Sequence, residues 1–157
     1  MKRLAPMNIL LVGNNPLELS DVHASISSFR KGLLKTTVLF DLKKIGQSIK
    51  NLNPSAIFID DRYSTKDLRK AIARVHRNAE TNHIPITLLK SSNYGNVAGI
   101  EADDFMMKTD LNGSSIYASI TNGRRFRKSR IYFNKVYRKR KGQLLELKEK
   151  VEDFFLY

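Results

Sequence analysis

The sequence contains no cysteine and no tryptophan. Without cysteine the chain can form neither a disulfide nor a thiolate zinc site, and it has no thiol nucleophile. Long apolar runs are also missing, since no stretch approaches the roughly 18 apolar residues of a membrane-spanning helix. The first apolar run ends before Gly13 and is too short for the apolar region of a signal peptide. We therefore expect a soluble, cytoplasmic protein.

The usual signs of an enzyme are also scarce. The three histidines, His23, His76 and His83, have no mutual spacing typical of metal binding or acid–base chemistry. The glycines follow no phosphate-loop pattern. A chain of 157 residues has room for one compact domain and an appendage. We expect a protein that is not an enzyme.

What the sequence does contain is a regular alternation of short apolar runs and amphipathic segments. The apolar runs predict strands at 8–12, 36–40, 55–60, 84–90 and 103–108. Spacings of three and four predict helices at 16–29, 41–52, 64–80, 93–100 and 112–120. Asp41 stands where a helix N-cap is expected. Five such alternations predict a doubly wound α/β domain with a parallel sheet and helices on both faces.

Three charged residues fall where predicted strands end. They are Asp60 after "AIFI", Lys90 after "ITLL" and Lys108 after "FMM". The carboxyl ends of parallel strands lie at one edge of a sheet, and ligands usually bind there. The three side chains are therefore candidates for one shared site.

Four stretches resemble the receiver domains of bacterial two-component response regulators. "ILLVGNNP" looks like their first strand and acidic loop, and "PSAIFIDD" like the strand with the phosphoaccepting aspartate. "IPITLLKSS" and "GIEADDFMMK" look like their fourth and fifth strands. The resemblance covers residues 7 to 122 and implies a flavodoxin-like (βα)5 sheet of order 2-1-3-4-5, here followed by an extended C-terminal helix.

The resemblance also assigns roles to residues. Asp60 matches the phosphoacceptor, Lys108 the lysine that contacts the phosphoryl group, and Phe105 the aromatic switch position. Lys90 stands where the family has a switch threonine or serine, although another register places Ser91 there. Purely structural roles are the alternative for each residue. Asp60 could cap a loop, both lysines could face solvent, and an aromatic such as Phe105 more often fills the core.

Gly13 and Asn14 stand where the family has an acidic pair. Mg²⁺ in phosphoryl transfer is usually held through carboxylates, and these two residues supply none. We therefore interpret the chain as a pseudo-receiver signalling module, in which Asp60, Lys90 and Lys108 form a standing polar network and no metal or other cofactor is expected. If the receiver is functional, Asp60 is phosphorylated and Mg²⁺ is required. A flavodoxin-like domain that binds FMN or a nucleotide is a weaker alternative.

The end of the chain has a different composition. Residues 124–157 hold 12 Lys and Arg against 4 Asp and Glu, or +8 of the total net charge of +13. We expect a receiver-like domain at 1–123 and a basic helical extension at 124–157. The stretch 124–141 has no acidic residue and forms a candidate basic patch: Arg124, Arg125, Arg127, Lys128, Arg130, Lys135, Arg138, Lys139, Arg140 and Lys141.

Several partners fit this extension. The basic patch could bind an anionic surface, either nucleic acid or membrane, or join the domain to a protein partner. No DNA-reading motif fits in its length. Leu144, Leu147, Val151 and Phe154 start a heptad seam, which predicts a homodimer through the last helix. The apolar end also suggests a linker to a missing C-terminal effector region, as in the receiver-like heads of membrane-associated sugar transferases, which would place the chain near a membrane.

Overall fold

The computed structural model describes residues 5–30, 32–92 and 99–156. Its centre is one parallel sheet with strand order β2-β1-β3-β4-β5. The strands are β1 (Met7–Val12), β2 (Leu34–Leu39), β3 (Ala56–Asp60), β4 (Ile86–Lys90) and β5 (Asp104–Met107). This order confirms the predicted flavodoxin-like sheet.

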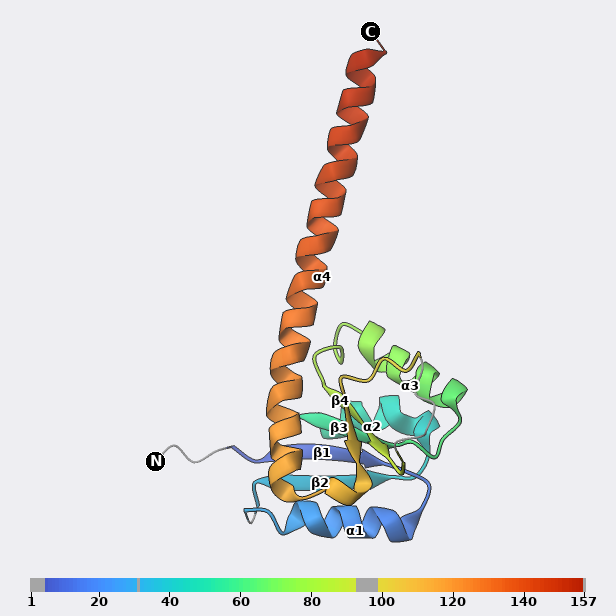
Figure 1. Cartoon of the computed structure of the whole chain (residues 1–157), viewed down its shortest axis with the longest axis vertical. Coiled ribbons are helices and arrows are strands. Elements are labelled where there is room, and N and C mark those ends of the chain that lie inside the picture. Colours follow the sequence, from blue (N-terminus) through green and yellow to red (C-terminus); the bar gives the residue numbers. More distant parts are fainter. Residues whose placement is uncertain (1–4, 31, 93–98, 157) are drawn as a thin grey trace.

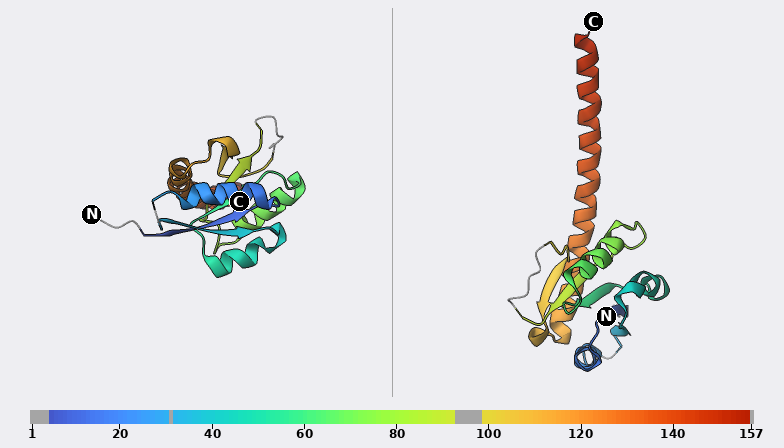
Figure 2. Two further views of the ribbon diagram at one scale, coloured as in Figure 1. Left: turned by 90° about the horizontal axis from the view of Figure 1, so that it is seen from below. Right: turned by 90° about the vertical axis from the view of Figure 1, so that its right-hand side faces the viewer.

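Helices cover both faces of the sheet (Figures 1 and 2). Between the strands lie α1 (Pro16–Ser27), the short η1 (Leu42–Lys44), α2 (Ile45–Leu52) and α3 (Thr65–Arg77), and the short η2 (Lys108–Asp110) follows β5. One apolar cluster joins the sheet to α2 and α3, and a second joins it to α1 and the first turns of α4 (Gly113–Phe155). Because both faces are covered, β1 from Ile9 to Val12 and β3 from Ala56 to Ile59 are apolar without polar alternation.

The helices begin at residues whose side chains cap the free backbone N–H groups. Asn15 Oδ1 accepts from the amide of Leu17, 3.1 Å away, with Pro16 in the first turn. Asp41 Oδ1 accepts from the amide of Lys43 at 3.0 Å, which confirms the predicted cap. The short helix predicted at 93–100 falls mostly on residues 93–98, outside the described part of the chain.

The last helix confirms the extended C-terminal helix of the expected fold and begins in the predicted segment 112–120. α4 runs without interruption for 43 residues, about 65 Å at 1.5 Å per residue. It starts with a capping box between Asn112 and Ser115, packs Ile116 and Ile120 into the core, and then leaves the domain (Figure 1). The expected boundary between residues 123 and 124 lies within this helix. None of the helices in the described ranges is both long and apolar enough to cross a membrane.

Candidate functional site

Asp60 is the last residue of the central strand β3, and its side chain is fully buried at the carboxyl edge of the sheet. Its Oδ1 accepts a hydrogen bond from the amide of Arg62 at 3.0 Å. Its Oδ2 accepts from the Lys108 ammonium at 2.8 Å. Both carboxylate oxygens therefore have donors, which is what a buried charge requires.

Lys108 follows β5 directly and supplies the cation of the site. Besides Asp60, its Nζ donates to Oε2 of Glu18 at 2.8 Å and to Oγ of Ser91 at 3.1 Å. An ammonium group has three protons, so these three bonds use its full donor capacity. Burial alone would lower the pKa of Lys108, but the hydrogen bonds with Asp60 and Glu18 outweigh it and raise the pKa. Lys108 is therefore held in the charged form.

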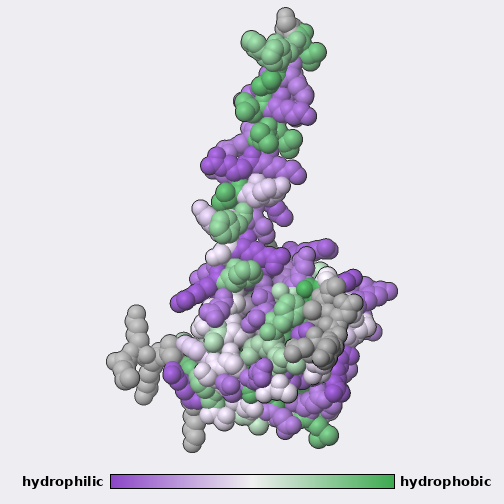
Figure 3. Space-filling model, in the orientation of Figure 1, coloured by the Kyte–Doolittle hydropathy of each residue, from purple (hydrophilic) through white to green (hydrophobic). Residues whose placement is uncertain are grey.

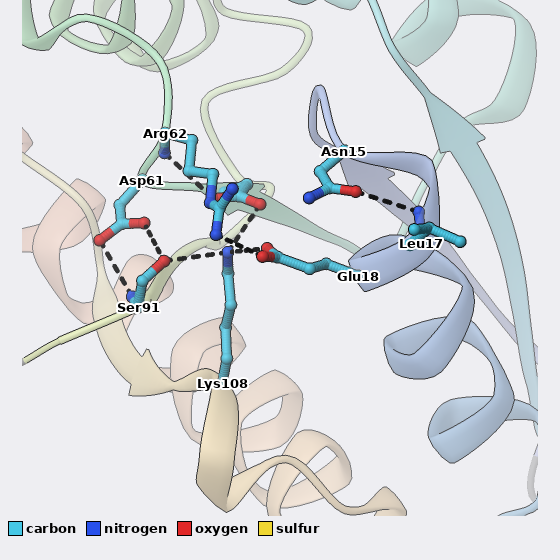
Figure 4. A network of polar contacts seen from close by, with 8 residues as sticks. Asn15, Leu17, Glu18, Asp61, Arg62, Ser91 and Lys108 are labelled. Atoms are coloured by element: carbon cyan, nitrogen blue, oxygen red, sulfur yellow. Dashed lines mark hydrogen bonds and ion pairs between the residues drawn. The ribbon is translucent and has the colours of Figure 1, made fainter.

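Glu18 brings a second carboxylate to the site from the first turn of α1. Figure 4 shows it beside the ammonium of Lys108 and the guanidinium of Arg62. Its pKa is lowered, chiefly by the hydrogen bond with Lys108 and against the opposing effect of burial. The sequence pattern did not predict Glu18 as a member of the site. The available signal was an acidic residue in the first turn of a helix that begins directly after the β1 loop, close to the sheet edge.

Ser91 closes the site on the side of β4. Its amide and its hydroxyl donate to the two oxygens of Asp61 at 3.1 and 3.0 Å, while its Oγ accepts from Lys108. Asp61 thus contacts the site through Ser91 (Figure 4). The structure has the alternative register, in which Ser91 and not Lys90 faces Lys108.

Lys90 does not take part in the expected network. Along β4, Leu88 packs in the cluster beneath α2 and α3, whereas Leu89 packs on the α1 side with Phe58. Alternation therefore places Lys90 on the face of Leu88 and Asp60 on the face of Phe58. Within the described residues the side chain of Lys90 makes no hydrogen bond or ion pair. The expectation that Lys90 is a charge partner of Asp60 was wrong, because one step along a strand changes the face.

The loop after β1 contributes no carboxylate. The amide of Gly13 donates to the Leu39 carbonyl at 3.1 Å, and Asn14 is exposed. A Cβ on Gly13 would lie 2.8 Å from Cδ2 of Leu19, which is 2 % exposed. Any larger side chain at position 13 therefore requires the buried Leu19 to move.

These donors do not fit a divalent cation in the arrangement found. The two carboxylates of the pocket, Asp60 and Glu18, each pair with the ammonium of Lys108, and Glu18 also pairs with Arg62. Across residues 5–30, 32–92 and 99–156, no three His, Cys, Asp or Glu side chains are grouped as metal ligands. A Mg²⁺ ion would have to displace Lys108 from both of its carboxylates.

Phe105 lies on β5, and 40 % of its surface is exposed. It is therefore not the core-filling residue that an aromatic in a strand most often is. Its pairing partner on β4 is Leu88, so it lies on the face of the sheet away from Asp60. Phe105 does not touch the network of Lys108, and its match to the switch position of receivers stays a prediction.

The sequence matches no protein-family model. No curated protein matches it either. Solved structures do match. The receiver domain of a sensor histidine kinase from Pseudomonas aeruginosa, with magnesium in its active-site cleft, aligns with 76 % of this chain and 98 % of that chain at 19 % identity and a TM-score of 0.63.

The chain has the fold of response regulator receiver domains. A protein described as a response regulator from Chloroflexus aurantiacus aligns with 74 % of this chain and 96 % of its own at 17 % identity and a TM-score of 0.61. The manganese-bound response regulator Rcp1 aligns with 74 % and 91 % at 17 % identity and a TM-score of 0.54. At these identities the likeness establishes the fold, and both metals are properties of those proteins.

The basic patch lies along α4, and one of its members is buried. Arg127 is 5 % exposed; its Nε donates to the Asn82 carbonyl at 2.8 Å, and its Nη1 lies 3.5 Å from Oδ1 of Asp103. Asp103 also accepts from the amide of Ile86 at 2.8 Å. Arg127 was wrongly assigned to the patch, because it fastens α4 to the domain. Burial lowers its pKa against the attraction of Asp103.

Proposed function

We propose that this chain is a pseudo-receiver of a two-component-type system: a cytoplasmic, non-enzymatic signalling module that works through protein contact. The observation that carries the proposal is the state of Asp60. Its side chain is fully buried, and both of its oxygens accept hydrogen bonds from within the chain. To attack a phosphoryl donor, a carboxylate oxygen must be accessible to it, whereas both oxygens of Asp60 are buried and each already accepts a hydrogen bond from within the chain.

The charge balance of the site supports the same proposal. Phosphoryl transfer to a carboxylate needs cationic charge to neutralise the transferring oxygens, and carboxylates to hold the metal that provides it. Here the carboxylates of Asp60 and Glu18 face the cations of Lys108 and Arg62. The internal cations therefore neutralise the carboxylates that a metal would need. Gly13 and Asn14, in place of an acidic pair, leave the β1 loop without a replacement.

Mass spectrometry of the intact chain after incubation with acetyl phosphate and Mg²⁺ tests the proposal. The expected result is an unchanged mass over a time course in which a functional receiver domain, run in parallel, gains a phosphoryl group. The matched control is Asp60→Asn. A phosphorylated species that forms with the native chain and disappears in this variant would show that the chain is a functional receiver.

A functional receiver is the second candidate, because one specific contact favours it. Lys108 lies against Asp60 at 2.8 Å, which is the pairing that the resemblance to receiver domains implies for a phosphoacceptor and its lysine. For this function Arg62 and Lys108 would have to move away from Asp60 and Glu18 when a donor and a metal bind. The same mass measurement separates the two functions.

A further inference from the structure

From Phe126 to Phe154, α4 carries a long stripe of exposed apolar side chains. Most of this stretch projects from the domain with no other described element beside it (Figures 1 and 2). Seven exposed residues form the stripe: Phe126, Phe133, Tyr137, Leu144, Leu147, Val151 and Phe154. Arg130 and Arg140 fill the two remaining positions of an unbroken spacing of four and three. We call these nine residues the seam.

The seam has the period of a coiled coil. Alternating steps of four and three average 3.5 residues, the repeat that keeps one stripe facing a partner helix over a long distance. It extends over about four heptads, the length at which such a pattern becomes specific. The side chains are 47–78 % exposed, and Figure 3 shows apolar groups along the projecting helix. Leaving so much apolar surface in water is unfavourable, so the seam is suited to a partner.

The charges around the seam select the partner. Arg130 and Arg140 lie within it, and Lys141, Lys148 and Lys150 occupy positions that flank it. The acids of this part of the helix fall on the outer positions: Glu146, Glu149, Glu152 and Asp153. One flanking cation, Lys148, has an exposed partner in Glu152 at 3.6 Å. The surface that faces a partner is therefore apolar and basic.

A second copy of this chain does not complement that surface. Two seams in contact would bring the same five cations together from each side, with no acid at the interface of either helix. Like charges at core and flanking positions of a coiled coil disfavour pairing. A lipid surface fits the arginines poorly as well, because Arg130 and Arg140 lie in the middle of the stripe that would enter the acyl chains.

We propose that the seam of α4 binds an acidic amphipathic helix of another protein, which places apolar residues in the heptad core and carboxylates opposite Arg130 and Arg140. Arginine and carboxylate pair through two parallel hydrogen bonds, and such a pair inside an apolar layer fixes register as well as partner. The inference rests on the interaction role proposed above. It does not depend on the phosphorylation state of Asp60.

The test uses the full chain and a synthetic four-heptad peptide as the probe. The peptide has leucine at its core positions, glutamate opposite Arg130 and Arg140, and glutamate at the flanking positions. A control peptide has lysine in place of every glutamate. Isothermal titration calorimetry should show saturable binding of the glutamate peptide and none of the lysine peptide.

Two variants with equal charge changes separate the seam from general attraction. Arg130→Glu with Arg140→Glu should weaken binding about tenfold or more. Arg138→Glu with Lys139→Glu makes the same change on the outer face and should alter binding less than about twofold. Equal loss in both variants would overturn the proposal, and so would absence of binding by the native chain.

Two further outcomes would overturn the proposal and identify a different partner for the seam. If sedimentation of the chain alone shows a dimer that Leu144→Glu dissociates, the seam serves a second copy. If the chain ignores the glutamate peptide and binds phosphatidylserine vesicles through the seam, the occupant is a membrane. If Asp60 is phosphorylated and the chain still binds the peptide, only the pseudo-receiver proposal is overturned. If Asp60 is not phosphorylated and the chain does not bind the peptide, only this inference is overturned.

Discussion

The ammonium of Lys108 and the carboxylate of Asp60 lie 2.8 Å apart, although 48 positions separate the two residues along the chain. The pair forms because Asp60 ends one parallel strand and Lys108 directly follows another at the same edge of the sheet. Glu18 and Ser91 then complete the shell of the ammonium. Because the Asp60 carboxylate is buried and paired with Lys108, we expect the pair to affect both the stability of the fold and the reactivity of Asp60.

Lys108→Met should destabilise the chain strongly. The variant leaves the buried carboxylate of Asp60 without its cation, a change that costs about 3 kcal/mol or more in buried pairs. Lys90→Met is the matched control, one strand away, and should change the free energy of unfolding by less than about 0.5 kcal/mol. Urea denaturation measures both. Similar losses in the two variants would contradict the assignment of Lys108 as the internal counter-ion.

Glu18→Gln should change how stability depends on pH. The folded-state pKa of Glu18 lies below its ordinary value of 4.5, so the carboxylate contributes stability above that value. This contribution is lost as the pH falls through the folded-state pKa. Because Glu18 is partly exposed, we expect an effect of no more than about 1 kcal/mol at neutral pH.

Unfolding of the native chain and of Glu18→Gln, compared at neutral pH and at about pH 3, checks this prediction. The difference between the two proteins should shrink in acid. Glu149→Gln on the exposed part of α4 is the control and should follow the native chain at both values. A difference that stays constant with pH would show that Glu18 acts through packing and not through its charge.

Arg127→Met should loosen the attachment of α4. The variant removes the bond to the Asn82 carbonyl and leaves Asp103 with one donor fewer in a buried site, for a loss of about 2 kcal/mol. Hydrogen exchange of the helix between Gly113 and Arg127 should become faster. Lys128→Met changes the neighbouring exposed residue and should leave exchange unchanged, so equal acceleration in both variants would argue against the anchor.

Alanine at two glycines should have opposite effects. Gly13→Ala places a Cβ 2.8 Å from the buried Leu19 and should cost about 1 kcal/mol of stability. In Gly142→Ala the added Cβ meets nothing within 4 Å on an exposed helix. The variant should therefore stabilise the helix by up to about 1 kcal/mol. Circular dichroism during thermal unfolding measures both. An undisturbed Gly13→Ala would mean that the β1 loop has room for a larger residue.

The sheet could be predicted from the sequence, because apolar runs of strand length alternate with amphipathic helices. The helix cap at Asp41 was also predicted correctly. The sequence was also sufficient for the pairing of Asp60 with Lys108 at the sheet edge. It did not place Lys90 correctly, since periodicity locates a strand but leaves a one-residue uncertainty that exchanges its faces.

The positions of two other residues, Glu18 and Arg127, are set by tertiary packing, which the local sequence pattern does not predict. Glu18 reaches the site because α1 begins directly behind the β1 loop and points its first turn at Lys108. Arg127 is buried because it lies one turn beyond Gly123, whose missing Cβ lets α4 approach Pro85 closely. In the sequence, Arg127 is one basic residue among ten.

We propose that internal cations keep Asp60 from metal-dependent phosphorylation. The amide of Arg62, which donates to Oδ1 of Asp60, is the most direct reporter. Nuclear magnetic resonance of the full chain during addition of Mg²⁺ and then acetyl phosphate should show no saturable shift of this amide. A saturable shift that appears with Mg²⁺, increases with acetyl phosphate and vanishes in Asp60→Asn would show that Asp60 is a working phosphoacceptor.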